Sequence, residues 1–66
     1  MLTANTITDE QIRELRDGAY RNDKATYFVA ACALGTNPYT AVGLDDDDLR
    51  GCRARCAEIL NVRAGR

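Results

Sequence analysis

The sequence predicts an all-α protein, a small three-helix bundle formed by a single domain spanning residues 1–66. Three observations predict this fold. Helix start signals occur near residues 8, 23 and 45, apolar residues recur at helical spacing after each signal, and the connecting stretches are short. A chain of this length can form only one domain with a small core. We therefore expect helices at about 9–20, 24–34 and 46–63.

The first helix has the clearest start signal. Thr8 can accept a hydrogen bond from the backbone N–H of Gln11, and the Gln11 side chain can reach back to Thr8, which together form a capping box. Ile7 and Ile12 occupy the two positions of a hydrophobic staple. The inner stripe of this helix consists of Ile12, Leu15 and Ala19. Before it, residues 1–6 show no periodic pattern, and we expect a flexible N-terminal tail there.

The second helix is apolar all round. Asn22 or Asp23 can serve as its N-cap, and Gly35 can end it in a left-handed conformation. One face holds Ala25, Phe28, Val29 and Cys32, and the opposite face holds Tyr27, Ala30, Ala31 and Leu34. A helix without a polar face is normally buried on all sides. Either it is the middle element, covered by both neighbours, or one of its faces contacts another chain.

The third helix begins at four consecutive aspartates. Before them, Asn37-Pro38 favours a turn, and residues 38–42 have room for a single helical turn that Gly43 would close. Acidic residues at a helix start and arginines further along match the helix dipole, so the last helix begins at Asp45 or Asp46. Its apolar stripe consists of Leu49, Cys52, Cys56, Ile59 and Leu60.

The composition argues against several classes of function. The chain has no histidine, which removes the commonest general base, and no serine, so we expect no enzymatic activity and no cofactor. A net charge of -1 makes a nucleic-acid partner unlikely. The longest uncharged apolar run, residues 25–34, is too short to span a bilayer. Residues 1–6 do not resemble a secretory signal, so we expect a cytoplasmic protein.

The three cysteines allow three interpretations. Cys52 and Cys56 share one helix face, and Cys32 lies on the inner face of the preceding helix. Three converging thiolates could hold zinc if a fourth ligand were available, and an oxidised pair could involve Cys32. A bridge between Cys52 and Cys56 is disfavoured by disulfide geometry within one helix turn. We prefer core packing, because free cysteine behaves as a small buried hydrophobe.

The four aspartates do not form a recognisable calcium loop. Such a loop needs glycine at its sixth position and an acidic residue at its twelfth, and counting from Asp45 these positions hold Arg50 and Cys56. Helix capping and a solvated acidic corner explain the run, with Asp46 spaced to pair with Arg50. A compact acidic cluster could also imitate nucleic-acid phosphates and occupy a basic groove on a partner.

Arginines form the one local excess of positive charge, in the last helix and just beyond it. Arg53 and Arg55 lie on opposite flanks of the apolar stripe, and Arg50 faces away from it. Phosphate binding is therefore weakly indicated. We expect the aliphatic stems of these arginines to cover the edge of the core. The full set is Arg50, Arg53, Arg55, Arg63 and Arg66.

The strongest candidate for a partner surface combines the second helix with the acidic corner. Tyrosines separated by small residues are favoured at interfaces. The alternative is that the apolar residues of this set only close a small core. The predicted partner-binding residues are Tyr27, Ala31, Leu34, Tyr39, Asp45, Asp46, Asp47 and Asp48, and no metal ligand or catalytic residue is predicted.

Three segments carry a resemblance to a known group of proteins. They are Ile7-Thr8-Asp9-Glu10-Gln11-Ile12-Arg13-Glu14-Leu15-Arg16, Cys32-Ala33-Leu34 and Arg53-Ala54-Arg55-Cys56-Ala57-Glu58-Ile59-Leu60. The chain thus resembles small uncharacterised helical proteins of bacteriophages and mobile elements, which share an Ile-Thr-Asp-Gln-Ile start and an Arg-x-x-Cys-Ala final helix. The resemblance implies a bacterial or viral cytoplasmic setting and carries over no catalytic residue. The sequence departs from that pattern at residues 20–24 and 37–42.

The leading hypothesis is a non-enzymatic protein-binding module of phage or mobile-element origin. It would occlude or bridge a host protein, such as a defence component, or bind a phage protein. The first alternative is a homodimeric structural or nucleic-acid-associated protein that uses its second helix as the interface. The second alternative is a small zinc protein.

Overall fold

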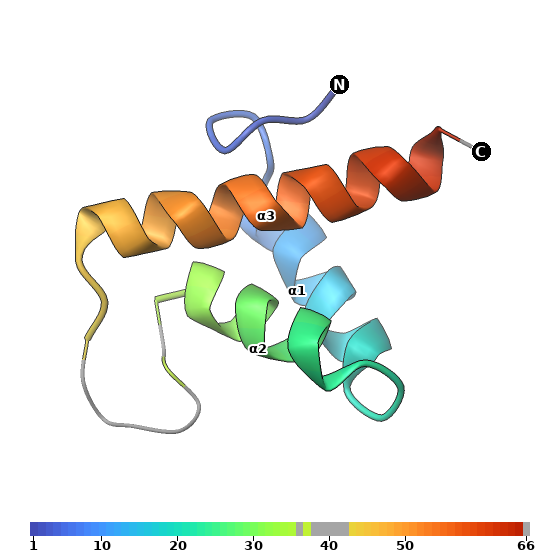
Figure 1. Cartoon of the computed structure of the whole chain (residues 1–66), viewed down its shortest axis with the longest axis horizontal. Coiled ribbons are helices and arrows are strands. Elements are labelled where there is room, and N and C mark those ends of the chain that lie inside the picture. The colour runs from blue at the N-terminus through green and yellow to red at the C-terminus, as the bar shows by residue number, and fades with distance from the viewer. Residues whose placement is uncertain (36, 38–42, 66) are drawn as a thin grey trace.

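The computed structural model describes residues 1–35, 37 and 43–65 of the chain. It contains three helices, α1 (Asp9–Ala19), α2 (Lys24–Ala33) and α3 (Asp46–Ala64). Figure 1 shows the long α3 lying across the two shorter helices. The predicted all-α three-helix bundle is confirmed, and each predicted helix end lies within one residue of the observed one. The helical turn predicted at 38–42 lies outside the described residues.

Local capping residues start all three helices. At Thr8 both hydrogen bonds of the predicted capping box are present. The backbone N–H of Gln11 donates to the Thr8 hydroxyl at 3.1 Å, and the backbone N–H of Thr8 donates to the side-chain oxygen of Gln11 at 2.9 Å. Of the alternative caps, Asp23 starts α2 and Asp45 starts α3. Gly35 follows α2 with a φ of 97°, which is the left-handed conformation expected of a glycine stop.

Helix α2 is the middle element of the bundle. It packs against both α1 and α3, whereas α1 and α3 share few contacts with each other. Two neighbours on different sides bury four consecutive residues of α2, which are Ala30, Ala31, Cys32 and Ala33. The first of the two interpretations of this all-apolar helix is therefore correct. Burial is not complete on all sides, because Ala25 in the first turn is exposed.

The core is built from a few large side chains and many small ones. Ile12 and Cys56 are completely buried, and Leu15 and Ile7 are nearly so. Alanines of α2 and α3 fill the space between them, which lets the helices approach closely. The buried cluster consists of Ile7, Ile12, Leu15, Ala30, Ala33, Cys56 and Ala57.

The N-terminal segment, residues 1–7, lies against α3. Figure 1 shows it crossing α3 on the side away from α2. Leu2 makes two hydrogen bonds to the side chain of Asn61, and a turn from Thr3 to Thr6 leads the chain back toward α1. The sequence predicts only a flexible tail at residues 1–6, and these contacts to α3 were not part of that prediction. Helix α3 is therefore covered on two sides, by α2 and by this segment.

Candidate functional site

The partner surface predicted on α2 is not a continuous exposed face. Ala31 is only 5% exposed, because α2 is the middle helix, so its inclusion is wrong. Leu34 is half-buried and packs against the core. Tyr27 is half-buried, with its ring centroid 5.5 Å from that of Tyr20. Tyr39 lies outside the described residues.

The acidic corner is exposed, as its sequence suggests, but its four members differ in role. Asp45 accepts a hydrogen bond from the backbone N–H of Asp48 at 2.8 Å and so caps α3. Asp46, Asp47 and the side chain of Asp48 face solvent around the first turn. The predicted pair between Asp46 and Arg50 is absent from the ion pairs of the described residues. The corner therefore combines one capping residue with three solvated carboxylates.

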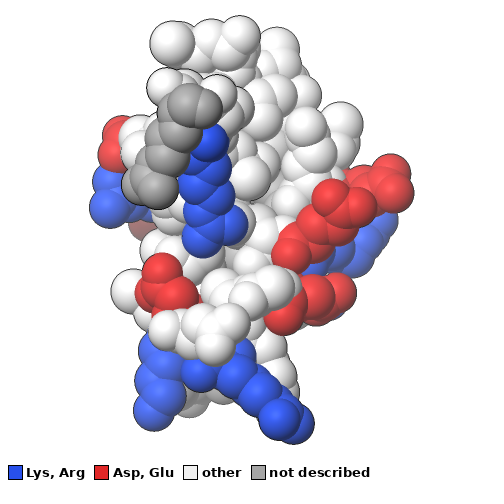
Figure 2. All heavy atoms as spheres, turned by 90° about the vertical axis from the view of Figure 1, so that its right-hand side faces the viewer, with Lys and Arg blue, Asp and Glu red and all other residues white. Residues whose placement is uncertain are grey.

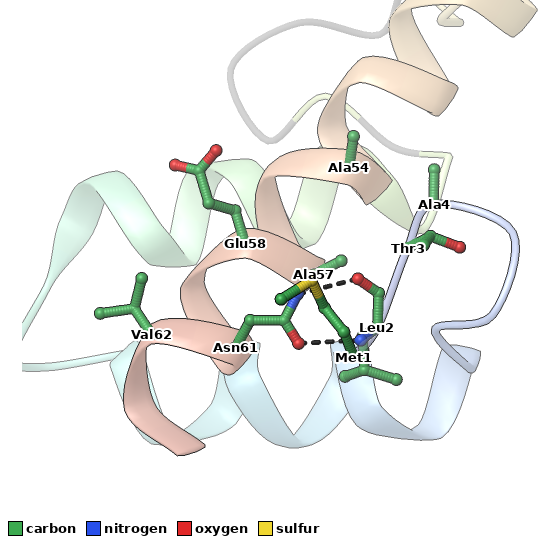
Figure 3. Close-up of a pocket in the computed structure, with 9 residues that line it drawn as sticks. All are labelled: Met1, Leu2, Thr3, Ala4, Ala54, Ala57, Glu58, Asn61 and Val62. Atoms are coloured by element: carbon green, nitrogen blue, oxygen red, sulfur yellow. Dashed lines mark hydrogen bonds between the residues drawn. The ribbon is translucent and has the colours of Figure 1, made fainter. Parts of the chain in front are cut away.

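A groove that the sequence did not predict lies between residues 1–4 and α3. It has a volume of about 480 Å³, and most of its lining is apolar. Figure 3 shows the α3 residues on one side and the N-terminal segment on the other. Val62, which is 58% exposed, stands at one end, and Glu58 is the charged residue in the lining. From α3 the lining residues are Ala54, Ala57, Glu58, Asn61 and Val62.

Asn61 fixes the wall of this groove. Its side-chain amide donates to the carbonyl of Leu2 and accepts from the N–H of the same residue, both at 2.8 Å (Figure 3). A primary amide can satisfy the donor and the acceptor of one extended residue in this way. Ala54 and Ala57 bring only methyl groups to the groove, so the α3 surface is low beside the larger side chains of Glu58 and Val62. Small residues of α3 therefore form the floor of the groove, and the two hydrogen bonds of Asn61 hold the N-terminal segment in place as its wall.

Arg53 is a second residue of α3 that attaches the N-terminal segment to this helix. Its guanidinium donates to the carbonyls of Ala4 at 3.4 Å and Ile7 at 2.6 Å, and it forms an ion pair with Asp9 at 2.7 Å. The hydrogen bond from Arg53 lowers the pKa of Asp9. The sequence predicts only that the Arg53 stem covers the core edge. Its polar partners were missed because they lie 44 to 49 residues away in the chain.

The cysteines lie at the contact between α2 and α3 and are free thiols. Burial raises the pKa of Cys56 to about 11, and burial also raises the pKa of Cys32 and of Cys52. Cys56 belongs to the core cluster and Cys52 packs against it, in agreement with the preferred packing role. Within the described residues, no group of three cysteine or acidic side chains has the arrangement of a metal site.

Charge is mixed over the surface. Figure 2 shows an uncharged upper region on the face at the right of Figure 1, with acidic and basic side chains next to one another below it. On α3 the side chains of Arg55 and Glu58 form an exposed ion pair. The groove presents mainly apolar surface on α3, and the acidic corner presents exposed charge at the start of the same helix.

Comparisons with known proteins found no match. No protein-family model, no curated protein and no solved structure matches the chain. No helix in the described part of the chain is both long enough and apolar enough to cross a membrane.

Proposed function

We propose that this protein is a non-enzymatic protein-binding module of phage or mobile-element origin. It acts in the cytoplasm of a bacterial host by occluding or bridging a host protein, and a defence component is the kind of target we consider first. The observation that carries the proposal is the groove of about 480 Å³ on α3, whose lining is mainly apolar. The resemblance to phage and mobile-element proteins supplies the setting.

The groove is suited to bind a protein surface. It is open and shallow, so an apolar side chain of a partner can enter it without a change in the backbone. Mainly apolar pockets of a few hundred Å³ are the usual starting point for a binding-site hypothesis. Val62 adds a large exposed apolar group at the end of the groove. Binding would cover these groups and remove them from water.

This proposal moves the binding surface from α2 to α3. The predicted surface depended on Ala31 and its neighbours being exposed, and Ala31 is buried between helices. The aspartates at 46–48 stay in the proposed surface, because they lie on α3 and are exposed. The homodimer alternative through α2 stays a second proposal, which sedimentation at several protein concentrations tests.

The proposal is tested by affinity capture from a bacterial lysate with a groove variant and a matched control. Ala54→Arg fills the groove, and Ala64→Arg places the same side chain at an exposed site of the same helix outside the groove. We expect a host protein to be retained by the wild type and by Ala64→Arg and to be lost with Ala54→Arg. A lack of any retained protein, or equal retention by both variants, would contradict the proposal.

A further inference from the structure

We infer that the outer face of α3 binds a basic amphipathic helix of the partner protein. This inference rests on the proposed function and names the chemistry of the segment that would occupy the groove. It follows from three observations. They are the residues that share the outer face of α3, the hydrogen bonds that already occupy the backbone of the neighbouring N-terminal segment, and the distribution of charge along α3.

A continuous strip of α3 faces away from the core. Residues separated by three or four positions share one helix face, and Gly51, Ala54 and Glu58 follow this spacing. Asp47 precedes them and Val62 follows them at the same spacing, and all five are exposed. From Gly51 to Val62 the strip is about 16 Å long, or three helical turns. This is the length over which a partner helix of similar size can pack.

Small residues in the middle of the strip allow a partner backbone to approach closely. Among the described residues, no atom other than those of the adjoining helix backbone lies within 4 Å of the position that a Cβ would take at Gly51. Ala54 and Ala57 contribute only methyl groups to the adjoining groove. Helices pack at an axis separation that depends on the side chains at the contact, and small residues give the shortest separations. The strip is thus low at Gly51 and Ala54, between the larger side chains of Asp47 and Glu58.

The occupant is a helix because the extended segment beside α3 has few backbone groups left for strand pairing. Both the N–H and the carbonyl of Leu2 are bonded to Asn61. The N–H of Thr3 donates to the Thr6 hydroxyl, and the Thr3 carbonyl accepts from Thr6 and Ile7. The Ala4 carbonyl accepts from Arg53. An added strand needs free backbone groups at an edge, whereas a helix docks through its side chains.

The charge around the strip favours a basic partner. Glu58 on the strip is paired with Arg55, so this pair adds no net charge. The net charge comes from the first turn, where the carboxylates of Asp46, Asp47 and Asp48 are exposed, with the exposed Arg50 one turn further on. The first turn of α3 therefore presents an excess of negative charge about 10 Å along the helix from Ala54, where the α3 side of the groove begins. A helix with an apolar stripe and lysine or arginine beside it matches both features.

Two synthetic helical peptides test this inference by ¹⁵N–¹H NMR titration of the full chain. Both carry the same leucine stripe, one with lysine and the other with glutamate at all polar positions. At low salt we expect the lysine peptide to bind about tenfold more tightly, the effect of a few exposed ion pairs acting together. Its shift changes should centre on Gly51, Ala54 and Val62, and raising the salt concentration should reduce the preference.

Two triple variants identify the carboxylates responsible. Changing Asp46, Asp47 and Asp48 to asparagine keeps the Asp45 cap and should abolish the preference for the lysine peptide. The matched control neutralises three exposed acids of α1, as Glu10→Gln, Glu14→Gln and Asp17→Asn, and should leave the preference unchanged.

Equal affinity for the two peptides, no binding of the lysine peptide, shift changes away from α3, or equal effects of the two triple variants would each overturn the inference. The lysate capture separates this result from the proposed function. If a protein is retained and then lost with Ala54→Arg while the lysine peptide does not bind, the protein-binding function stands and the basic-helix assignment is wrong.

Discussion

Arg53 is the residue on which the attachment of the N-terminal segment depends most. It is the donor to two backbone carbonyls and to Asp9, and its side chain is 25% exposed. Changing Arg53→Met keeps the aliphatic stem and removes every donor. We expect the free energy of unfolding to fall by about 1–2 kcal/mol, mainly through the carbonyl contacts. Chemical denaturation followed by circular dichroism measures this change.

Arg50→Met is the matched control for this prediction. Arg50 is an exposed arginine of the same helix and takes part in no ion pair of the described residues. Its substitution should change the free energy of unfolding by less than about 0.5 kcal/mol. Equal losses for the two variants would mean that the Arg53 contacts do not stabilise the fold.

The buried thiol of Cys56 makes the free energy of unfolding depend on pH in the alkaline range. The unfolded thiol loses its proton near the ordinary pKa of 9.0, whereas the folded thiol keeps it until about 11. Between these values the unfolded state binds fewer protons, so the stability contributed by the buried neutral thiol falls as the pH rises. We expect a loss of about 1–3 kcal/mol from this group between pH 9 and 11.

The comparison with Cys56→Ala isolates this contribution, because other groups also ionise above pH 9. Urea denaturation at several pH values should give a steeper fall in stability for the wild type than for the variant. Parallel curves for the two proteins would contradict the assignment of the slope to Cys56. Below pH 8 the difference between the two should be constant, since the thiol is then neutral in both states.

At the scale of the helix, the four aspartates that begin α3 are not equivalent. Asp45 accepts the backbone N–H of Asp48, whereas Asp47 only places a charge near the helix start. Asp45→Ala should therefore cost about 1 kcal/mol, and Asp47→Ala about 0.3 kcal/mol. Thermal unfolding followed by circular dichroism measures both. A larger loss for Asp47→Ala would show that charge near the dipole matters more than the cap.

The helices were predictable because their signals are local. Thr8 and Gln11 satisfy each other within four residues, and Asp23 and Asp45 act on N–H groups three residues away. The faces of α2 were less predictable. From Tyr27 to Ala33 every residue is apolar or aromatic, so the sequence contains no polar position there that marks the outer side. The positions of α1 and α3 bury Ala30 to Ala33 and leave Tyr27 to Val29 half-buried.

At the scale of the whole molecule, the groove could not be predicted because its walls come from opposite ends of the chain. Leu2 and Asn61 are 59 residues apart, and neither belongs to a recognisable motif. An asparagine within a helix is usually read as a surface residue, so its bonds to a distant backbone leave no sequence signal. The acidic corner, in contrast, was predictable as an exposed cluster because charge and capping are both visible in the sequence.

A substitution at Asn61 tests whether the N-terminal segment opens independently of the rest of the molecule. Asn61→Leu removes both hydrogen bonds to Leu2 and retains a side chain of similar size. We expect the amide hydrogens of residues 2–7 to exchange faster, while those of α2 keep their protection. Uniformly faster exchange would mean that the segment is part of a single cooperative unit. Unchanged exchange would mean that Asn61 does not hold the segment.

The central claim is that the protein binds its partner through the outer face of α3. Site-specific photo-crosslinking in bacterial cells tests it most directly, with the crosslinking residue placed at Val62 in one variant and at Tyr20 in the other. Both positions are exposed to a similar extent, at 58% and 63%, and they lie on different elements. Our account predicts a discrete adduct with a host protein from position 62 and none from position 20. An adduct from position 20 alone, or none from position 62, would contradict it.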